Sequence, residues 1–177
     1  METGILSKRY AKAIYKYALE KGNEEHLLHD MVALSTQFAK LPVLDMVMED
    51  PTVDNRQKIK LLSSAAGENP SETYKHAVSV IVGNGRASYA KTIALMYDKV
   101  YRKEKNIVLL KLTTTSPVQA DTKQQLVNLV ANIEHKTVHF EEKTDDIVGG
   151  FILQIEDMRL DASIKNQLNK LKLKLTK

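Results

Sequence analysis

From residue 7 to about residue 105, apolar side chains recur every three or four positions. In the first segment Tyr10, Ile14 and Ala18 form such a row, and a second row that begins at Ala11 runs beside it. This spacing places side chains on one face of an α-helix. Gly22 suits the end of that helix, because glycine readily adopts the left-handed conformation of many helix ends. The pattern therefore predicts an amphipathic helix over residues 7–22.

Capping and breaking residues divide the rest of this half into five further helices. Asn23, Asp54 and Ser71 are residue types that favour helix N-caps, and Pro51 and Gly67 favour helix ends. The expected helices span residues 24–40, 41–48, 55–66, 72–82 and 88–105. Their clearest apolar stripes are Leu27, Met31, Leu34 and Phe38, and Tyr89, Ile93, Met96 and Val100. Six helices joined by short connections predict a compact bundle.

After Lys105 the period of the pattern changes. The run 106–118 is rich in β-branched residues and alternates, with Val108, Leu110 and Leu112 on one face. This alternation is typical of a half-buried strand. A helix is expected next, over residues 122–136. The apolar face expected for this helix consists of Leu126, Leu129, Val130 and Ile133.

Three short strands and a last helix complete the pattern. The strands are expected over residues 137–143, 151–155 and 158–160, with a hairpin turn at Glu156-Asp157. Their inward residues are expected to be Val138, Phe140, Phe151, Leu153 and Ile155. Ser163 then caps a helix. The stripe of this helix is Ile164, Leu168, Leu171 and Leu175.

The change of period predicts an α+β protein with two domains. Residues 1–105 are expected to form the six-helix bundle, and residues 106–177 a small α/β domain with the element order β-α-β-β-β-α. So small a second core is marginal alone and gains from packing against another molecule.

The formal net charge of +4 raises a nucleic-acid hypothesis. However, residues 1–105 carry 16 Lys and Arg against 13 Asp and Glu, and residues 106–177 carry 10 against 9. A dedicated nucleic-acid binder concentrates its positive charge. Only the last helix does so, and cations there also suit the negative end of the helix dipole. The charge alone decides little.

Composition limits the compartment and the chemistry. The chain has no cysteine, so it has no disulfides and no thiolate chemistry. No run of about 18 apolar residues occurs, so we expect no membrane-spanning helix. The first ten residues lack the apolar core of a signal peptide. We therefore expect a cytoplasmic protein, with a bacterial origin favoured.

Two glycine motifs need an interpretation. Gly149-Gly150 precedes a strand, whereas phosphate-binding loops follow a strand and open a helix, so we interpret it as a site of positive φ or close backbone approach. The corner Asn84-Gly85-Arg86 lies between two helices. A left-handed helix cap is its expected role, and a recognition loop is the alternative.

No reaction centre is recognisable. His26 and His29 share a helix face, but the third ligand of a metal site is missing. The acidic pairs lie in a strand and a loop, where solvation gives them no contrasting environments. The serines show no nucleophile motif. We expect no catalytic, cofactor or metal site, and hence a role in binding or assembly.

All seven tyrosines lie in the helical half. Aromatic residues at helical spacing mostly belong to a core. A groove floored by alanine and rimmed by tyrosine can also receive a partner helix. Ala11 and Ala13 beside Tyr10 would permit such a close approach.

Taken together, these residues resemble the delta subunit family of bacterial F-type ATP synthases, whose mitochondrial relative is the oligomycin-sensitivity-conferring protein. The resemblance covers essentially the whole chain. It rests on three stretches, namely 9–13 (RYAKA), 84–86 (NGR) and 149–153 (GGFIL), the last followed by Asp157, Asp161, Ser163 and Leu168. One departure is Ala162, where many relatives have glycine.

The resemblance implies a non-catalytic stator subunit. Its helical domain would hold the N-terminal helix of an ATP synthase α subunit on the catalytic head, between the first and fifth helices. The matching residues are Tyr10, Ala13, Ile14, Tyr17, His76 and Val80. Its second domain would meet the b subunits of the peripheral stalk, with Gly150 shaping that domain. The chain would lie on the cytoplasmic face of the bacterial inner membrane, associated with the membrane only through the complex.

One alternative remains open at this stage. An RNA-binding helical protein of the transcription antitermination type would use the excess Lys and Arg of the helical half and the lysines of the last helix on phosphates. The balanced charges and the lack of an aromatic RNA-stacking motif disfavour this alternative.

Overall fold

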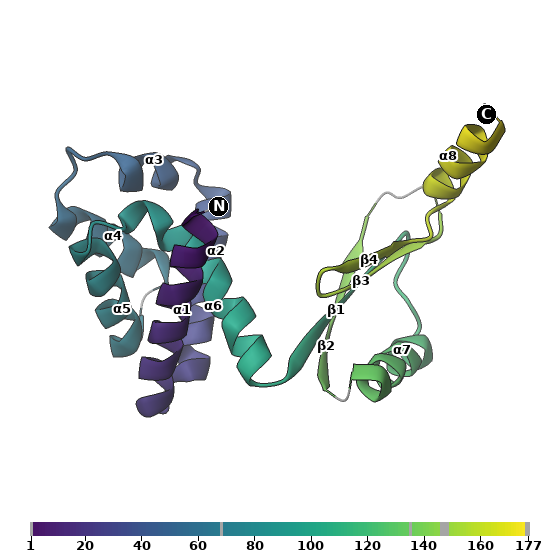
Figure 1. Ribbon diagram of the computed structural model, residues 1–177, viewed down its shortest axis with the longest axis horizontal. Coiled ribbons are helices and arrows are strands. Elements are labelled where there is room, and N and C mark those ends of the chain that lie inside the picture. Colours follow the sequence, from purple (N-terminus) through teal and green to yellow (C-terminus); the bar gives the residue numbers. More distant parts are fainter. Residues whose placement is uncertain (1, 68, 135, 146–148, 176–177) are drawn as a thin grey trace. The chain divides into compact units, whose positions relative to one another are not determined.

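The structure, a computed structural model, describes residues 2–67, 69–134, 136–145 and 149–175 (Figure 1). The chain divides into two compact units, residues 1–102 and 103–177. We call them the helical unit and the sheet unit. The division falls slightly before the boundary expected at residue 105.

The helical unit is built from the helices that the apolar spacing predicts. They are α1 (Glu2–Glu20), α2 (Glu24–Lys40), α3 (Val43–Glu49), α4 (Asn55–Ala65), α5 (Glu72–Gly83) and α6 (Ala90–Glu104), with a 3₁₀ turn η1 (Ala87–Tyr89) before α6. The last expected helix thus begins with a 3₁₀ turn, and α1 begins earlier than expected.

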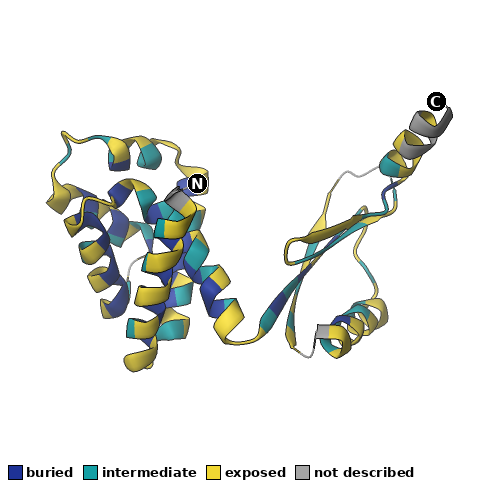
Figure 2. Ribbon diagram, in the orientation of Figure 1, coloured by how far each residue is buried: buried dark blue, intermediate teal, exposed yellow. Residues whose placement is uncertain are grey.

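The core of the helical unit follows one expected stripe and corrects another. Leu27, Met31, Leu34 and Phe38 are all buried. In α6, Met96 is only partly buried, and Tyr97 and Tyr101 take the core positions instead. Their rings pack 6.2 and 6.3 Å from the ring of Tyr15 on α1. Figure 2 shows the buried positions of this unit along the helices, alternating with exposed ones.

Polar side chains join α2 to the start of α5. The buried Asp30 carboxylate accepts hydrogen bonds from the amide and the hydroxyl of Ser71, at 3.0 and 2.6 Å. The Ser71 hydroxyl in turn accepts from the amide of Tyr74 and caps α5 as predicted. Asn23 stands at the N-cap of α2, but its side chain makes no capping hydrogen bond there. Instead, its side-chain amide donates to the hydroxyl of Thr73 at 3.0 Å.

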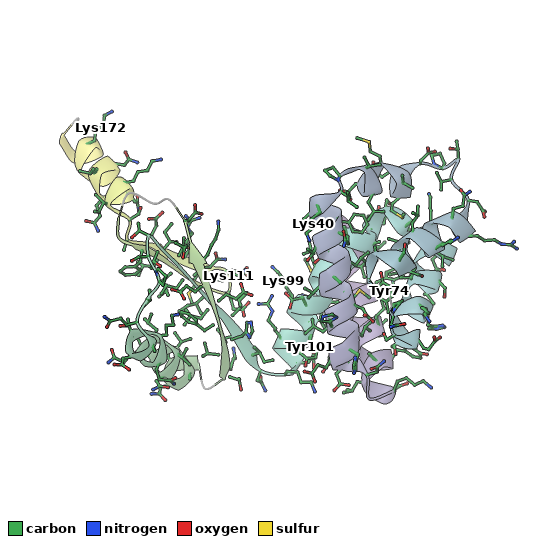
Figure 3. All side chains as sticks on the ribbon, turned by 180° about the vertical axis from the view of Figure 1, so that it is seen from behind. Lys40, Tyr74, Lys99, Tyr101, Lys111 and Lys172 are labelled. Atoms are coloured by element: carbon green, nitrogen blue, oxygen red, sulfur yellow. The ribbon has the colours of Figure 1, made fainter. Side chains whose placement is uncertain are left out.

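Tyr74 and Lys58 satisfy backbone carbonyls inside the unit. The Tyr74 hydroxyl donates to the carbonyl of Leu62 at 2.6 Å. Figure 3 labels Tyr74 among the helices of this unit. Burial raises the pKa of Tyr74 well above its ordinary value, and the nearby Asp30 carboxylate raises it further. The Lys58 ammonium donates to the carbonyls of Met48 and Asp50, at 3.1 and 2.6 Å. It therefore satisfies carbonyls at the end of α3 that have no partner within the helix.

The sheet unit has the predicted order of elements. They are β1 (Ile107–Thr114), α7 (Ala120–Glu134), β2 (Thr137–Thr144), β3 (Phe151–Ile155), β4 (Met158–Asp161) and α8 (Ile164–Leu175). The strand order is β2-β1-β3-β4. β1 and β2 are parallel and joined through α7, whereas β3 is antiparallel to β1 and to β4.

The core of this unit is small and lies between the sheet and α7. The predicted face of β1, namely Val108, Leu110 and Leu112, is buried, as is Val130 of α7. Partly buried side chains complete the core, and they are Leu126, Val138, Phe140, Leu153 and Ile155.

One prediction for α7 is wrong. Leu129 is 57% exposed and Ile133 is 68% exposed, although both lie on the apolar face that the spacing predicts. Leu126 and Val130 make the contact with the sheet core. The remainder of this helix face has no cover in the described part of the sheet unit.

The two glycines join the start of β3 to the start of α8. Gly149 and Gly150 have φ of +69° and +82°. A Cβ on Gly150 would lie 2.4 Å from the carbonyl oxygen of Ala162 and 2.9 Å from the Cα of Ser163. The amide of Ile164 donates to the Gly149 carbonyl at 3.2 Å. The predicted positive φ and close backbone approach are therefore confirmed.

Asp161 and Ser163 shape the other side of this junction. The Asp161 carboxylate accepts from the Ser163 hydroxyl at 2.6 Å and from the Ser163 amide at 3.1 Å. These two hydrogen bonds hold the pKa of Asp161 below its ordinary value. The Ser163 hydroxyl also accepts from the amide of Asn166, so it caps α8 as predicted.

The link between α2 and α5 predicts a large stability effect. Replacing Asp30 by Ala should destabilise the helical unit by about 2–3 kcal/mol, because it removes a buried charged acceptor and leaves two partly buried donors of Ser71 unpaired. The matched variant Asp45→Ala removes a half-exposed pair with Lys91 (2.7 Å), and should cost about 1 kcal/mol or less. Urea denaturation followed by tyrosine fluorescence measures both. Equal losses would contradict the assigned role of Asp30.

The glycine junction predicts a graded pair of effects. Gly150→Ala should cost about 3 kcal/mol, since the new Cβ meets backbone and adds to left-handed strain. Gly149→Ala should cost only about 1–2 kcal/mol, because its Cβ meets the side-chain end of Ile164, which can rotate. The tyrosines all lie before residue 103. Amide hydrogen exchange over residues 103–177 is therefore the measurement, and a reversed order would contradict the close approach at Gly150.

Candidate partner-binding site

A groove of about 890 Å³ runs between α1 and α5 on the helical unit. α1 contributes a row of residues from Ile5 to Tyr17, and α5 contributes three residues. The corner after α5 closes one end. The lining consists of Ile5, Leu6, Arg9, Tyr10, Ala13, Ile14, Tyr17, His76, Ala77, Val80, Asn84, Arg86 and Tyr89.

The groove exists because α1 carries apolar residues on two neighbouring faces. Ala11, Tyr15 and Ala18 are buried against the rest of the unit. The row through Tyr10 and Ala13 is offset from them around the helix and faces the groove. Ala13 is exposed, so its small side chain leaves open space above the backbone.

The two helices run in opposite directions along the groove. At one end, the rings of Tyr17 and His76 are 5.0 Å apart. At the other end, the Ser7 and Thr92 hydroxyls lie 2.8 Å apart, and Thr92 donates to the carbonyl of Tyr89 at 2.9 Å. The start of α1 therefore lies beside the end of α5 and the corner that follows it.

The corner at residues 84–86 is a left-handed helix cap, as predicted. Gly85 has a φ of +66°. Its amide donates to the carbonyl of Val82, and the amide of Arg86 donates to the carbonyl of Ile81, both at 2.9 Å. These two hydrogen bonds end α5 and turn the chain back towards α1. Asn84 and Arg86 thereby line the groove as well.

All six residues that the resemblance implied lie in this groove: Tyr10, Ala13, Ile14, Tyr17, His76 and Val80. What they bind stays a prediction. The sequence reasoning missed several lining residues, notably Ile5, Arg9 and Tyr89. Arg9 lies four residues before Ala13, and Ile5 lies four residues before Arg9, so all three share one face of α1. Extending the row of Ala13 towards the start of the helix would have found both. Tyr89 and Arg86 needed the tertiary structure, because they lie beyond the end of α5.

The chemistry of the groove suits binding. Its walls are mainly aliphatic and aromatic, with the His76 ring 5.0 Å from the ring of Tyr17 and the polar side chains of Arg9, Asn84 and Arg86 also in the lining. In the part of the chain that the structure describes, no group of three or more His, Asp or Glu side chains could hold a metal ion. His26 and His29 are both exposed on α2. An apolar, elongated groove of this kind fits an amphipathic helix.

The sheet unit carries a second apolar surface. Met158 and Leu160 of β4 pair with Ile155 and Leu153 of β3, so they lie on the face of the sheet that holds the core. Yet they are 64% and 57% exposed. The apolar face of the sheet therefore extends beyond the area that α7 covers. Phe151 on β3 is an exposed member of the same face, and Leu129 and Ile133 of α7 and Ile164 and Leu168 of α8 are further exposed apolar side chains of this unit.

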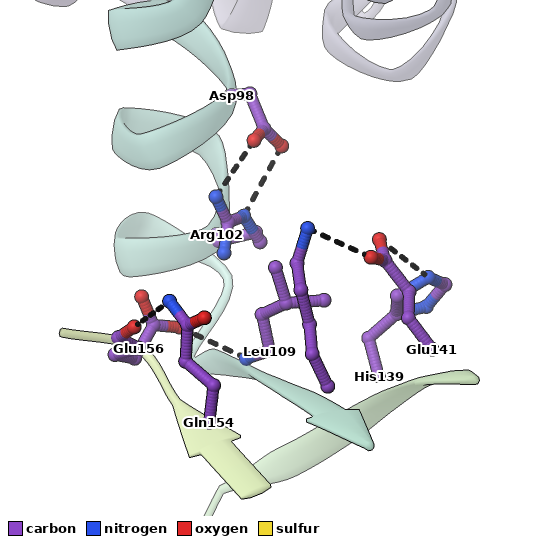
Figure 4. Close-up of polar contacts among 8 residues, drawn as sticks. Asp98, Arg102, Leu109, His139, Glu141, Gln154 and Glu156 are labelled. Atoms are coloured by element: carbon purple, nitrogen blue, oxygen red, sulfur yellow. Dashed lines mark hydrogen bonds and ion pairs between the residues drawn. The ribbon is translucent and has the colours of Figure 1, made fainter. Parts of the chain in front are cut away.

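The opposite face of the sheet carries many polar side chains, some of which form ion pairs with one another. The Lys111 ammonium on β1 lies 2.9 Å from the Glu141 carboxylate on β2 (Figure 4). The Glu156 carboxylate accepts from the amide of Leu109 at 2.9 Å. On this face, an ion pair across strands lies beside the partly buried Leu109 and Ile152, so this face is more polar than the face that holds the core.

The fold and the groove thus define a class of protein with two unlike units, one an all-α unit with a preformed helix-sized groove and the other a small α+β unit with an incomplete apolar cover. A sequence profile described as "ATP synthase delta (OSCP) subunit" matches residues 6–175. The chain belongs to this family.

Individual relatives agree along the full length of the chain. The chain is 47% identical to ATP synthase subunit delta of Azobacteroides pseudotrichonymphae over 97% of this chain and 98% of that protein. It is 39% identical to ATP synthase subunit delta of Bacteroides fragilis, covering 97% and 94% of the two chains. The fold matches a chain in the cryo-EM structure of the Toxoplasma gondii mitochondrial ATP synthase hexamer, with a TM-score of 0.68, 19% identity and coverage of 97% and 98%. That last likeness establishes a shared fold.

Proposed function

We propose that this chain is the non-catalytic stator subunit of a proton-translocating F-type ATP synthase. It links the catalytic head to the peripheral stalk, so that the torque of the rotor drives ATP synthesis. Family membership supports the complex in which it works. The groove between α1 and α5 is the observation that carries the proposed mode of action.

The helical unit holds the N-terminal helix of an α subunit in the groove. The lining of α1 extends from Ile5 to Tyr17, which at 1.5 Å per residue corresponds to roughly 18 Å, or about three turns of a partner helix. Ile14 and Ala77 are buried and form the floor. Tyr10 and Tyr17 are half-buried at the sides, where their rings can contact an incoming apolar stripe.

The sheet unit binds the b subunits of the peripheral stalk through its uncovered apolar face. A helix laid against Met158 and Leu160 would remove from water side chains that are now mostly exposed. Ile164 and Leu168 on α8 provide a second line of apolar contact. This partner would complete a core that is small in the isolated unit.

Two attachments on one chain give the stator its strength. Each partner is tethered to the same complex, so release of one contact leaves the other in place. Such linkage gives effective concentrations on the order of millimolar and slows complete dissociation. The task needs slow dissociation under load and no covalent chemistry, which agrees with a binding groove as the main feature of the helical unit.

The chain would act at the cytoplasmic face of the bacterial inner membrane, as a peripheral subunit held there by the complex. Among the described residues, no single helix combines the length and the apolar character that crossing a membrane requires. The RNA-binding alternative gains no support from the relatives, which are ATP synthase delta subunits.

Ala13→Asp should block docking of the chain to the catalytic head. The substitution puts an unpaired carboxylate against an apolar helix, which should weaken binding at least about 100-fold. Co-sedimentation with delta-depleted catalytic heads measures the effect. Ala39→Asp makes the same change at an exposed position of α2 outside the groove, and should bind normally. Unchanged docking of Ala13→Asp would contradict the groove assignment.

Leu168→Asp should weaken binding of the b subunits without unfolding the chain. Leu168 is 59% exposed, so the cost to the isolated chain should be within about 0.5 kcal/mol, while a carboxylate in an apolar interface should weaken binding at least about tenfold. Pull-down of the b subunits' soluble part measures the effect. Asn169→Asp adds the same charge at the neighbouring exposed position and serves as the control. If both variants bind like the wild type, α8 does not contact the stalk.

A further inference from the structure

The groove is apolar along its length but strongly cationic at one end. Arg9 and Arg86 both line it. The hydrogen bonds from Ser7 through Thr92 to Tyr89 bring the start of α1 next to the corner after α5. Arg9 therefore lies at the same end as Arg86, about 12 Å along α1 from Tyr17 at the opposite end.

These two cations have no acidic counterpart in the groove. Among the lining residues that the structure describes, none is Asp or Glu. The guanidinium carbon of Arg86 lies 5.8 Å from the ring centroid of Tyr89, a cation–π contact that does not neutralise the charge. Neither Arg9 nor Arg86 forms an ion pair with a side chain that the structure describes.

The arginines lie where they could distinguish one partner helix from another by the position of its acidic residues. Two like charges at the end of an apolar groove repel each other weakly and stay hydrated in the free protein. An incoming carboxylate would form charge-assisted, bidentate hydrogen bonds with a guanidinium at the edge of a surface that docking dehydrates. An acidic residue placed over the Tyr10 to Val80 segment would instead be buried without a partner.

We propose that the groove selects a helix whose apolar stripe is flanked by carboxylates at the end that meets Arg9 and Arg86. The inference rests on the proposed function, in which the occupant is the N-terminal helix of an α subunit. It adds a charge requirement, and hence a direction, to a contact that apolar packing alone would leave nearly symmetric. A helix with its acidic residues at the other end would meet Tyr17 and His76, where the Lys21 ammonium lies 6.0 Å from the Tyr17 ring centroid but outside the groove lining, and would bind more weakly.

The test uses the full chain and a synthetic peptide of the N-terminal segment of the α subunit from the same organism, with fluorescence anisotropy as the readout. Arg9→Gln and Arg86→Gln should each weaken binding about three- to fivefold at low salt, and the double variant about tenfold or more. This loss should shrink as sodium chloride rises to about 0.5 M, because salt screens the pairs in the wild type.

Two controls separate charge from packing. The double variant Lys12→Gln with Lys16→Gln removes the same net charge from exposed positions of α1 outside the groove lining, and should bind with an unchanged affinity within about twofold. Arg9→Lys with Arg86→Lys keeps the charge but loses the planar fork of donors, so it should restore the salt dependence but only part of the affinity. A peptide with its acidic residues replaced by Gln should bind the wild-type chain as weakly as the parent peptide binds the Arg9→Gln, Arg86→Gln variant.

The outcomes distinguish this inference from the proposed function. If the arginine-to-glutamine variants bind with unchanged affinity and salt dependence while Ala13→Asp abolishes binding, the carboxylate requirement is wrong and the groove assignment stands. If the Gln-substituted peptide binds as well as its parent while the arginine variants are weakened, the arginines contact backbone carbonyls and the proposal is overturned. If the peptide binds neither the wild type nor any variant, the proposed function itself fails.

Discussion

A single constraint organises the helical unit: α1 has apolar residues on two neighbouring faces, and its own unit buries only one of them. Ala11 and Tyr15 pack into the core. Tyr10 and Ala13 remain at a groove whose other wall is α5. Because apolar surface that is left in water favours a partner that covers it, the packing of α1 sets both the core and the place of the proposed docking. The corner at Gly85 then adds the cationic end of the groove.

The sheet unit is incomplete in a different way. Its apolar face spans four strands, but α7 covers only part of it, so Met158 and Leu160 at the β4 edge stay exposed. A covering helix from another molecule would supply the missing layer, as in any two-layer α+β core. Each unit thus offers an apolar surface suited to a helix from elsewhere. This shared property is what an adaptor under mechanical load requires.

Local backbone devices support both surfaces. In the helical unit, Gly85 ends α5 in the left-handed conformation and turns Arg86 towards the groove. In the sheet unit, Gly150 lets the backbone at the start of β3 pass within contact distance of the turn before α8. The Asp161 carboxylate holds the same turn through Ser163. These residues set the course of the backbone and take no part in a reaction. Because few residue types can adopt such backbone geometry, the motifs were recognisable in the sequence.

The sequence by itself determined the type, order and approximate limits of the elements, because periodicity, caps and glycines are local properties of the chain. It also pointed to the groove residues through the family resemblance. Only the tertiary structure decided which apolar faces are covered. Ile133 has the spacing of a core residue and is exposed, while Tyr97 replaces Met96 in the core. That Arg9 and Arg86 line the same end of the groove was equally beyond prediction. The physical reason is that a pattern reports which side chains share a face, whereas burial and charge neighbourhood depend on elements distant along the chain.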